Sequence, residues 1–122
     1  MHLSQIASQN PNKPAYIMAG SGQTVTYEGL EAGSNQLAQL FRSLGLMRGD
    51  HIAILLENHV LFLQICVAAQ RAGIYYTAIS YRLQSDEVEY IVNDCGARVF
   101  ITSIDRRAVV EPLIGRLENL DQ

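Results

Sequence analysis

Lysine is almost absent from this sequence of 122 residues, in which Lys13 is the only one. It lies between Asn12 and Pro14, in a segment whose composition is typical of a loop. A mechanism that needs a lysine to neutralise a phosphate or to form a Schiff base therefore has a single, poorly placed candidate. The other basic residues are arginines, at positions 42, 48, 71, 82, 98, 106, 107 and 116.

Cysteine is also scarce, and its two positions point to neither a disulfide nor a metal site. Cys66 and Cys95 each fall within an apolar helical pattern, where free cysteine commonly behaves as a small buried hydrophobe. No CxxC pair occurs, and His2, His51 and His59 do not cluster with the cysteines at zinc-ligand spacing. We expect no metal.

Runs of like charge and long apolar runs are both missing. The formal net charge is −3, so nothing indicates a surface for nucleic acid or for an anionic membrane. The longest strongly apolar stretch, 60–69, is interrupted by Gln64 and is too short to cross a bilayer, which needs about 20 residues. Residues 1–10 lack the basic and apolar regions of a secretory signal. We expect a cytoplasmic location and no transmembrane segment.

Enough apolar residues are present, 48% of the chain, for one buried core. Residues 3–9 have apolar residues at helical spacing, and 14–18 and 23–27 are strand-like runs separated by Gly20-Ser21-Gly22. We interpret that glycine pair as a hairpin turn. A phosphate-binding loop would lead into the start of a helix, whereas a strand-like segment follows here.

From Thr26 onwards, helical and strand patterns alternate. Thr26 can cap a helix that Gly45 ends, and the apolar run 51–56 is typical of a strand covered on both faces. On the helix that follows Thr26, one face is formed by Leu30, Ser34, Leu37, Ala38, Phe41 and Leu44. Asn58 can cap a second helix that runs to Ala72 and is apolar over most of its circumference, so neighbours should bury it on several sides.

The same alternation continues to the last residues. Residues 74–79 are strand-like, Ser85 opens a helix that Gly96 ends, and 99–102 form another short strand. That helix has Val88, Ile91, Val92 and Cys95 on one face, and a last helix is indicated by Val110, Leu113, Ile114 and Leu117. Its start stays open, because Pro112 is tolerated in a first turn and disrupts an interior.

Alternating helices and strands favour an α/β fold with three layers, in which a mostly parallel sheet has helices on both faces. An N-terminal β-hairpin precedes it.

Motifs for dinucleotides, Walker-type nucleotide binding, serine hydrolysis and zinc proteolysis (GxGxxG, GxxxxGK[ST], GxSxG, HExxH) do not occur. We interpret His51 and His59 as surface or satisfied histidines, and Asp50 and Asp94 as turn and cap residues. No residue is predicted to be catalytic.

Longer patterns carry more information. Residues 45–58 contain a Gly-Leu, a Gly-Asp and an apolar strand ending near Asn, 72–76 begin with Ala-Gly, and 78–83 end in Arg-Leu. In this order they resemble the amino-terminal region of the adenylate-forming superfamily, and AMP-forming acyl-CoA synthetases above all. Segments 11–15, 26–27 and 90–97 match as well, so the resemblance covers almost the whole chain. Three positions depart from the usual pattern: Ala78 replaces a proline, Ser80 an asparagine, and Gly29 stands where an acidic helix residue is common.

The resemblance implies that residues 1–122 are an N-terminal subdomain, a fragment of the large N-terminal domain of such an enzyme. The full-length parent would use ATP and Mg²⁺ to convert a carboxylic acid, a fatty acid in the acyl-CoA synthetases, to an acyl-adenylate, and would then transfer the acyl group to CoA. The family's adenylation signature, its acidic ribose-binding motif and its late lysine would lie beyond Gln122. We therefore expect the fragment alone to be inactive and to bind no cofactor.

Arg82 is the one residue to which the resemblance assigns a ligand. It matches the motif arginine that lies near the CoA nucleotide in some acyl-CoA-forming members, and a guanidinium suits a phosphate. The alternative is an arginine that is solvated or paired with Asp86 or Glu89.

Two other functions stay open. The chain could be a self-contained flavodoxin-like binding or interaction module, or a superfamily member with another acceptor, as in peptide synthetase adenylation domains or luciferases. A fragment would also leave its apolar helix and its sheet edges partly uncovered, so we expect the isolated chain to self-associate.

Overall fold

The computed structural model describes residues 2–122, which form two separate sheets and the helices around them. The elements are α1 (Leu3–Gln9), β1 (Pro14–Ile17), β2 (Thr24–Thr26), α2 (Tyr27–Ser43), β3 (His51–Leu55), α3 (Phe62–Ala72), β4 (Tyr75–Ile79), α4 (Ser85–Cys95), β5 (Val99–Thr102), the 3₁₀ turn η1 (Ile104–Arg106), α5 (Arg107–Val110) and the 3₁₀ turn η2 (Glu111–Leu113). None of the helices in this described part is both long and apolar enough to cross a membrane.

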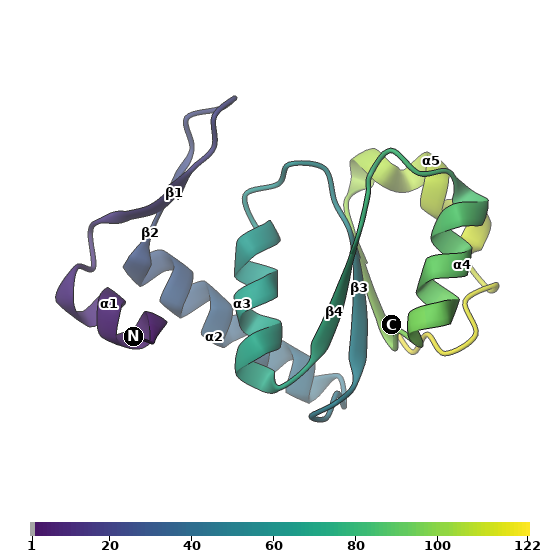
Figure 1. Ribbon diagram of the computed structural model, residues 1–122, viewed down its shortest axis with the longest axis horizontal. Coiled ribbons are helices and arrows are strands. Elements are labelled where there is room, and N and C mark those ends of the chain that lie inside the picture. Colours follow the sequence, from purple (N-terminus) through teal and green to yellow (C-terminus); the bar gives the residue numbers. More distant parts are fainter. Residues whose placement is uncertain (1) are drawn as a thin grey trace.

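The main sheet has three parallel strands in the order β4-β3-β5. Helices α2 and α3 lie on one side of it and α4 and α5 on the other (Figure 1), and a separate apolar cluster fills each side. The central strand β3 is therefore covered on both faces, and from Ile52 to Leu55 its residues are fully buried. The predicted three-layer α/β fold is confirmed, as is the antiparallel hairpin of β1 and β2.

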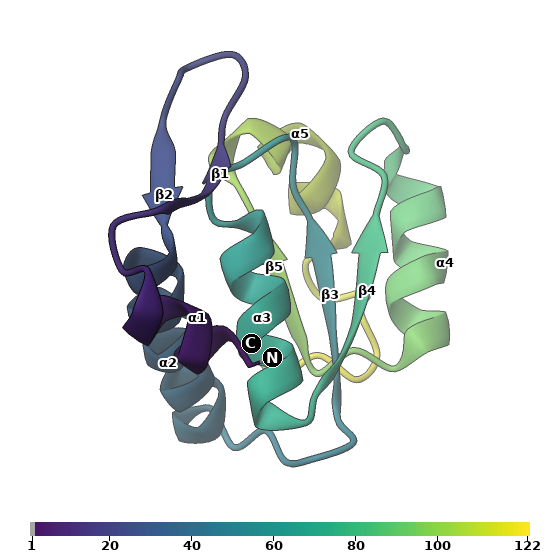
Figure 2. The same ribbon diagram turned by 60° about the vertical axis from the view of Figure 1, so that its left-hand side comes forward.

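The hairpin turn closes as the sequence predicts. The amide of Met18 donates to the carbonyl of Gln23 and the amide of Gly22 to the carbonyl of Met18, both at 2.8 Å. Gly22 has a φ of 74°, which a side chain would strain. In Figure 2 the hairpin lies beyond the amino end of α2, away from the main sheet.

Helix α2 follows the predicted capping signals. The side-chain oxygen of Thr26 accepts a hydrogen bond from the amide of Gly29 at 3.1 Å, and Gly45 has a φ of 84° just past the helix end. The buried face includes Leu30, Ser34 and Phe41. This face packs on α3, so α2 forms the outer wall of that side of the sheet.

Helix α3 begins at Phe62, and the predicted start at Asn58 is wrong. The ring nitrogen Nδ1 of His59 accepts a hydrogen bond from the amide of Leu61, which makes a turn of this segment. The carbonyl of Val60 accepts a bond from the Tyr16 hydroxyl at 2.5 Å, so the hairpin holds the residues that precede the helix. The expected burial on several sides is also incomplete, because Leu63 is 48% exposed.

The single helix predicted around 110–117 is replaced by α5 and two 3₁₀ turns. Pro112 lies in the first turn of η2, since it has no amide hydrogen to continue α5. Leu113 is then fully buried, whereas Ile114 is 77% exposed. The apolar residues that indicated a last helix are thus not buried alike.

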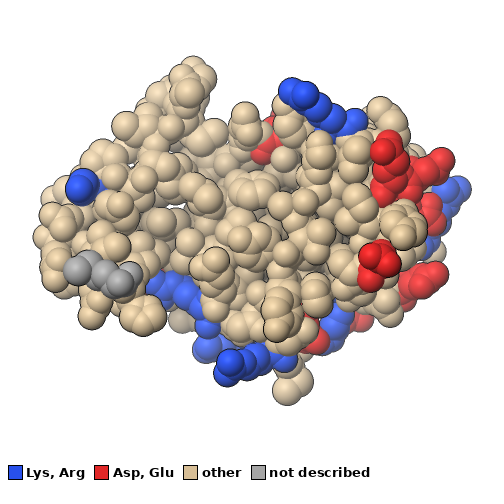
Figure 3. All heavy atoms as spheres, in the orientation of Figure 1, with Lys and Arg blue, Asp and Glu red and all other residues tan. Residues whose placement is uncertain are grey.

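Charged side chains are unevenly spread over the face seen in Figure 3. Acidic side chains gather over α4, while the area over α1, the hairpin and α3 is mostly uncharged. The acidic residues of α4 are Asp86, Glu87, Glu89 and Asp94.

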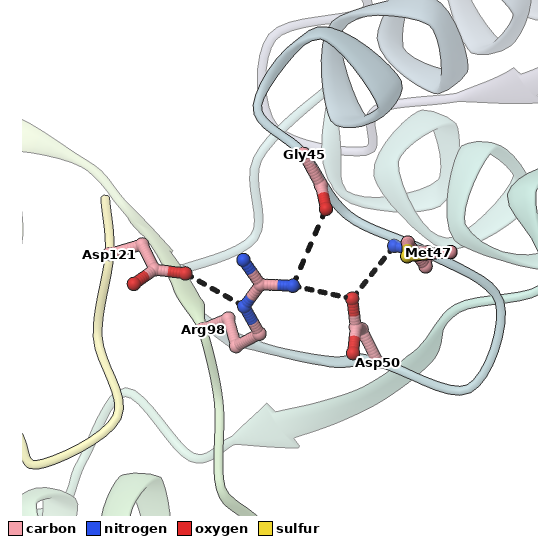
Figure 4. A network of polar contacts seen from close by, with 5 residues as sticks. All are labelled: Gly45, Met47, Asp50, Arg98 and Asp121. Atoms are coloured by element: carbon pink, nitrogen blue, oxygen red, sulfur yellow. Dashed lines mark hydrogen bonds and ion pairs between the residues drawn. The ribbon is translucent and has the colours of Figure 1, made fainter.

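A polar network fixes the amino ends of β3 and β5 (Figure 4). Arg98 donates to Asp50 at 2.8 Å, to Asp121 at 2.7 Å and to the carbonyl of Gly45 at 3.4 Å. Asp50 also accepts a bond from the amide of Met47 at 2.7 Å, which confirms its interpretation as a turn residue. That amide, and then Arg98, lower the pKa of Asp50. The segment from Gly45 to Asp50 is thus held to Arg98 at the start of β5, and its role is structural.

Candidate functional site

The carboxyl ends of β3, β4 and β5 lie at one edge of the sheet, at the top of Figure 2. In open parallel sheets, ligands bind outside this edge. The hydroxyl of Thr102 donates to the carbonyl of Leu55 at 2.9 Å, so the ends of two strands are tied together. Five polar residues follow the three strands and meet here: Glu57, Tyr81, Arg82, Ser103 and Arg106.

Glu57 is the acidic member of this cluster. Its Oε2 accepts a hydrogen bond from the Ser103 hydroxyl at 2.7 Å and lies 3.7 Å from Nε of Arg106. The Ser103 bond, the backbone amide of Glu57 and the nearby His59 and Arg106 together lower the pKa of Glu57. The carboxylate therefore stays charged and neutralises Arg106.

Tyr81 brings the two arginines together. Arg106 donates from Nη1 to the carbonyl of Tyr81 at 3.0 Å, and its guanidinium carbon lies 5.7 Å from the centre of the Tyr81 ring. The guanidinium carbon of Arg82 lies 5.6 Å from the same ring centre. Both distances are within the range of a cation–π contact, so one ring supports two cations.

Arg82 does not form the ion pair that the alternative prediction named. Within residues 2–122, the arginines paired with carboxylates are 71, 98, 106 and 107. Neither Asp86 nor Glu89 pairs with Arg82, although both belong to the acidic surface of α4. The other part of that alternative, a solvated arginine, agrees with the structure, because Arg82 is exposed.

Two hollows flank residues 56–59 at the same edge. The larger, of about 600 Å³, lies between the hairpin and the start of α3 and is lined in part by Tyr16, Met18 and Phe62. The smaller, of about 340 Å³, lies between this segment and the end of β5. Arg82 lines neither hollow, so it stands at an open surface.

The histidines take structural positions. The ring of His51 stacks on Tyr75 with 5.0 Å between centres, at the amino end of the sheet, and His59 caps a turn. These contacts agree with the interpretation of both as surface or satisfied histidines. Across residues 2–122, no three His, Cys, Asp or Glu side chains come together in a way that could hold a metal ion. Both cysteines are free, and Cys66 is buried.

Of the residues in this cluster, the family resemblance points to Arg82 and not to Glu57, Ser103 or Arg106. Each of the three is an ordinary surface residue in its local pattern. The signal that could find two of them is position, because Glu57 and Ser103 follow directly after apolar, strand-like runs. Parallel strands bring such residues to one edge.

Comparison with known proteins decides the family. The sequence profile of the AMP-binding enzyme family matches residues 3–122. The chain belongs to the AMP-binding enzyme family. The expected resemblance to adenylate-forming enzymes is thereby confirmed over almost the whole chain.

Two proteins with similar sequences are named as ligases. The chain is 30% identical over 111 residues to long-chain-fatty-acid–CoA ligase FadD13 of Mycobacterium tuberculosis, a match that covers 91% of this chain and 22% of that protein. It is 30% identical over 107 residues to fatty acid–[acyl-carrier-protein] ligase ScoC of Streptomyces coeruleorubidus, with 88% and 20% covered. The chain thus spans about a fifth of the length of these relatives.

A solved structure of the AMP-binding family has the same fold. The fatty acyl CoA synthetase of Mycobacterium tuberculosis superposes with a TM-score of 0.89 and 27% identity. The superposition covers 98% of this chain and 24% of that one. Nearly every described element therefore has a counterpart in that synthetase.

Proposed function

We propose that this chain is the N-terminal subdomain of an acyl-CoA ligase. The whole enzyme would join a carboxylic acid, of the fatty acid class, to AMP with release of pyrophosphate, and CoA thiolate would then displace AMP. The observation that supports this most is the superposition of 98% of the chain on a quarter of a fatty acyl CoA synthetase. The relative named as a long-chain-fatty-acid–CoA ligase supports the acid class.

The residues of this subdomain do not supply the groups that the proposed reaction with ATP needs. Attack on ATP requires positive charge around the phosphates. The one lysine, Lys13, lies in the loop between α1 and β1, and the turn at Gly20 and Gly22 leads into β2 and not into a helix. No metal-binding group occurs in the described residues. ATP and Mg²⁺ would therefore be held by other segments, and the subdomain alone would have no turnover.

Arg82 is the residue of this chain that we assign to a ligand, a phosphate of CoA. Its guanidinium is free of carboxylates in the described residues and lies against an aromatic ring at the sheet edge where ligands bind. Hydrogen bonds to charged groups contribute about 1.5–3 kcal/mol. Loss of the contact should thus raise the KM for CoA roughly tenfold or more.

The experiment separates the two half-reactions of the full-length enzyme. Arg82→Ala should raise the KM for CoA and leave acid-dependent exchange of pyrophosphate into ATP, measured without CoA, unchanged. Arg116→Ala removes an exposed arginine elsewhere and should change neither. An unchanged KM for CoA, or an equal loss in both half-reactions, would contradict the assignment.

A second acceptor is favoured by one observation, the similarity to a relative named as a fatty acid–[acyl-carrier-protein] ligase. In that case a carrier-protein thiol, and not CoA, would take the acyl group. Incubating the full-length enzyme with fatty acid and ATP, and with either CoA or a carrier protein bearing phosphopantetheine, identifies the acceptor from the thioester that accumulates.

The rival to a ligase subdomain is a self-contained module of the same fold. The coding sequence downstream of the Gln122 codon discriminates them. A reading frame that continues into a Gly-rich segment with Pro-Lys-Gly supports the ligase, and a stop codon directly after Gln122 supports the module.

The isolated chain should also self-associate. Strand β4 is an edge of the sheet, with Tyr75 exposed to 62%, and Leu61 and Leu63 near the start of α3 are exposed as well. Unpaired edges and apolar surface favour association. Light scattering should give a mass above that of one chain, and a monodisperse monomer would be evidence against this.

A further inference from the structure

Arg106 connects two strand ends that are not neighbours in the sheet. It lies in η1 after β5, and it donates to the carbonyl of Tyr81 after β4, while β3 lies between those strands. Within residues 81–84 of the described chain, this is the one hydrogen bond from a distant segment; the others are local, such as the 3.4 Å bond from the Arg82 amide to the Ser80 hydroxyl. Tyr81 and Leu83 also pack against the apolar cluster beside α4, so Arg106 supplies the polar part of the anchorage of the loop that carries Arg82.

Arg106 is itself held in place. Its backbone amide donates to the carbonyl of Ser103 at 3.1 Å, and its Nε faces Glu57, which Ser103 also fixes. Both partners of this ion pair are about three-quarters buried, with exposed side-chain fractions of 26% and 24%. Ser103, Glu57, Arg106 and Tyr81 thus form a chain of contacts that joins the ends of all three strands.

The planar guanidinium of Arg106 makes three contacts at once. It faces the Glu57 carboxylate, donates to the Tyr81 carbonyl and lies near the Tyr81 ring. A lysine ammonium is a compact point charge and does not reproduce this set of contacts. The ion pair also directs charge, because Glu57 neutralises Arg106 and leaves the charge of Arg82 unpaired among the described residues.

We propose that Arg106 is a positioning residue that holds the loop of residues 81–84, so that the guanidinium of Arg82 lies against the Tyr81 ring at the carboxyl edge of the sheet. What Arg82 contacts there rests on the proposed function. The positioning itself requires no ligand and is measured on the chain alone.

The test is NMR of the 122-residue chain carrying Arg106→Gln, Arg106→Lys or the neighbouring control Arg107→Ala. Arg107 is 67% exposed and pairs with Glu111. In the Gln variant, the side-chain signals of Arg82 should lose their ring-current shift, and amide exchange of residues 81–84 should accelerate at least tenfold. The Lys variant should not restore either property, and the control should leave both unchanged.

Glu57→Gln is a second, milder variant in case Arg106→Gln fails to fold, and it should shift the Arg82 signals in the same direction. A folded Arg106 or Glu57 variant in which Arg82 and the loop amides keep their wild-type signals overturns the proposal. So does full rescue by lysine, because any cation would then suffice.

Kinetics of the full-length enzyme separate this proposal from the proposed function. Arg106→Gln should raise the KM for CoA when Arg82 is present. It should not raise this KM further in an enzyme that already carries Arg82→Ala. If Arg106→Gln loosens Arg82 in the NMR spectrum but Arg82→Ala leaves the KM for CoA unchanged, the CoA assignment fails and the positioning stands. If Arg82→Ala raises that KM while the NMR signals of Arg82 do not change in Arg106→Gln, only the positioning proposal fails.

Discussion

Replacing Leu113 by alanine should destabilise the chain strongly, and replacing the adjacent Ile114 should not. Leu113 is fully buried in the apolar cluster between the sheet and α4, together with Val88 and Val92. Ile114 is 77% exposed. The two side chains are isomers of equal size, so the comparison isolates burial.

The expected magnitude follows from that burial. Leu→Ala in a core costs about 2–5 kcal/mol, from lost transfer free energy and from the cavity left behind. Exposed substitutions usually change stability by less than about 0.5 kcal/mol. Since single domains are stable by roughly 5–15 kcal/mol, Leu113→Ala would remove a large share of the total. For a chain of this size the melting temperature should fall by roughly 3–5 °C per kcal/mol.

Urea denaturation followed by circular dichroism measures both variants under one set of conditions. We expect a lower midpoint with an unchanged slope for Leu113→Ala, and the wild-type midpoint for Ile114→Ala. Equal losses in the two variants would refute the reasoning, because they would mean that a continuous helix buries both residues on one face.

Two further predictions concern backbone conformation and pH. Gly73 ends α3 with a φ of 72°, and an added Cβ would lie 2.8 Å from Cγ of Arg48, so Gly73→Ala should cost about 1–2 kcal/mol or more in urea denaturation, while Gly20→Ala, in open space, should be neutral. The pKa of Glu57 is lowered in the folded chain, so its stabilising effect is complete above the ordinary pKa of a glutamate, about 4.3, and is lost as the pH falls through the lowered value. The stability difference between wild type and Glu57→Gln should therefore shrink as the pH falls through that range, and a difference independent of pH would contradict the assigned role.

Local signals in the sequence predicted most of the fold. Thr26 and Gly45 mark the ends of α2, and Gly96 ends α4, because capping and left-handed backbone depend on residues close in the chain. The apolar run of β3 also predicted a strand covered on both faces. These features require no knowledge of distant contacts.

The failures have non-local or competing causes. The sequence predicts too early a start for α3, because the bond from Tyr16 to Val60 joins residues far apart in the chain. The last helix was expected to be continuous because Leu113 and Ile114 fit an apolar pattern, and Pro112 prevented it. Local patterns do not register the first effect, whereas Pro112 is a local signal that leaves the start of the last helix open.

The candidate site was predicted least completely. Arg82 was found from a family resemblance, but its neighbours Glu57 and Arg106 come from the ends of other strands. Only the parallel strand order brings them together, and sequence patterns do not specify that order.

The most direct test of the central claim is an assay of pyrophosphate release by the purified 122-residue chain with fatty acid, ATP, Mg²⁺ and CoA. A scaffold with one loop lysine and no phosphate-binding loop should release no more pyrophosphate than a reaction without protein. Release that depends on both the chain and the fatty acid would contradict the claim that the activating groups of the proposed enzyme lie outside these residues.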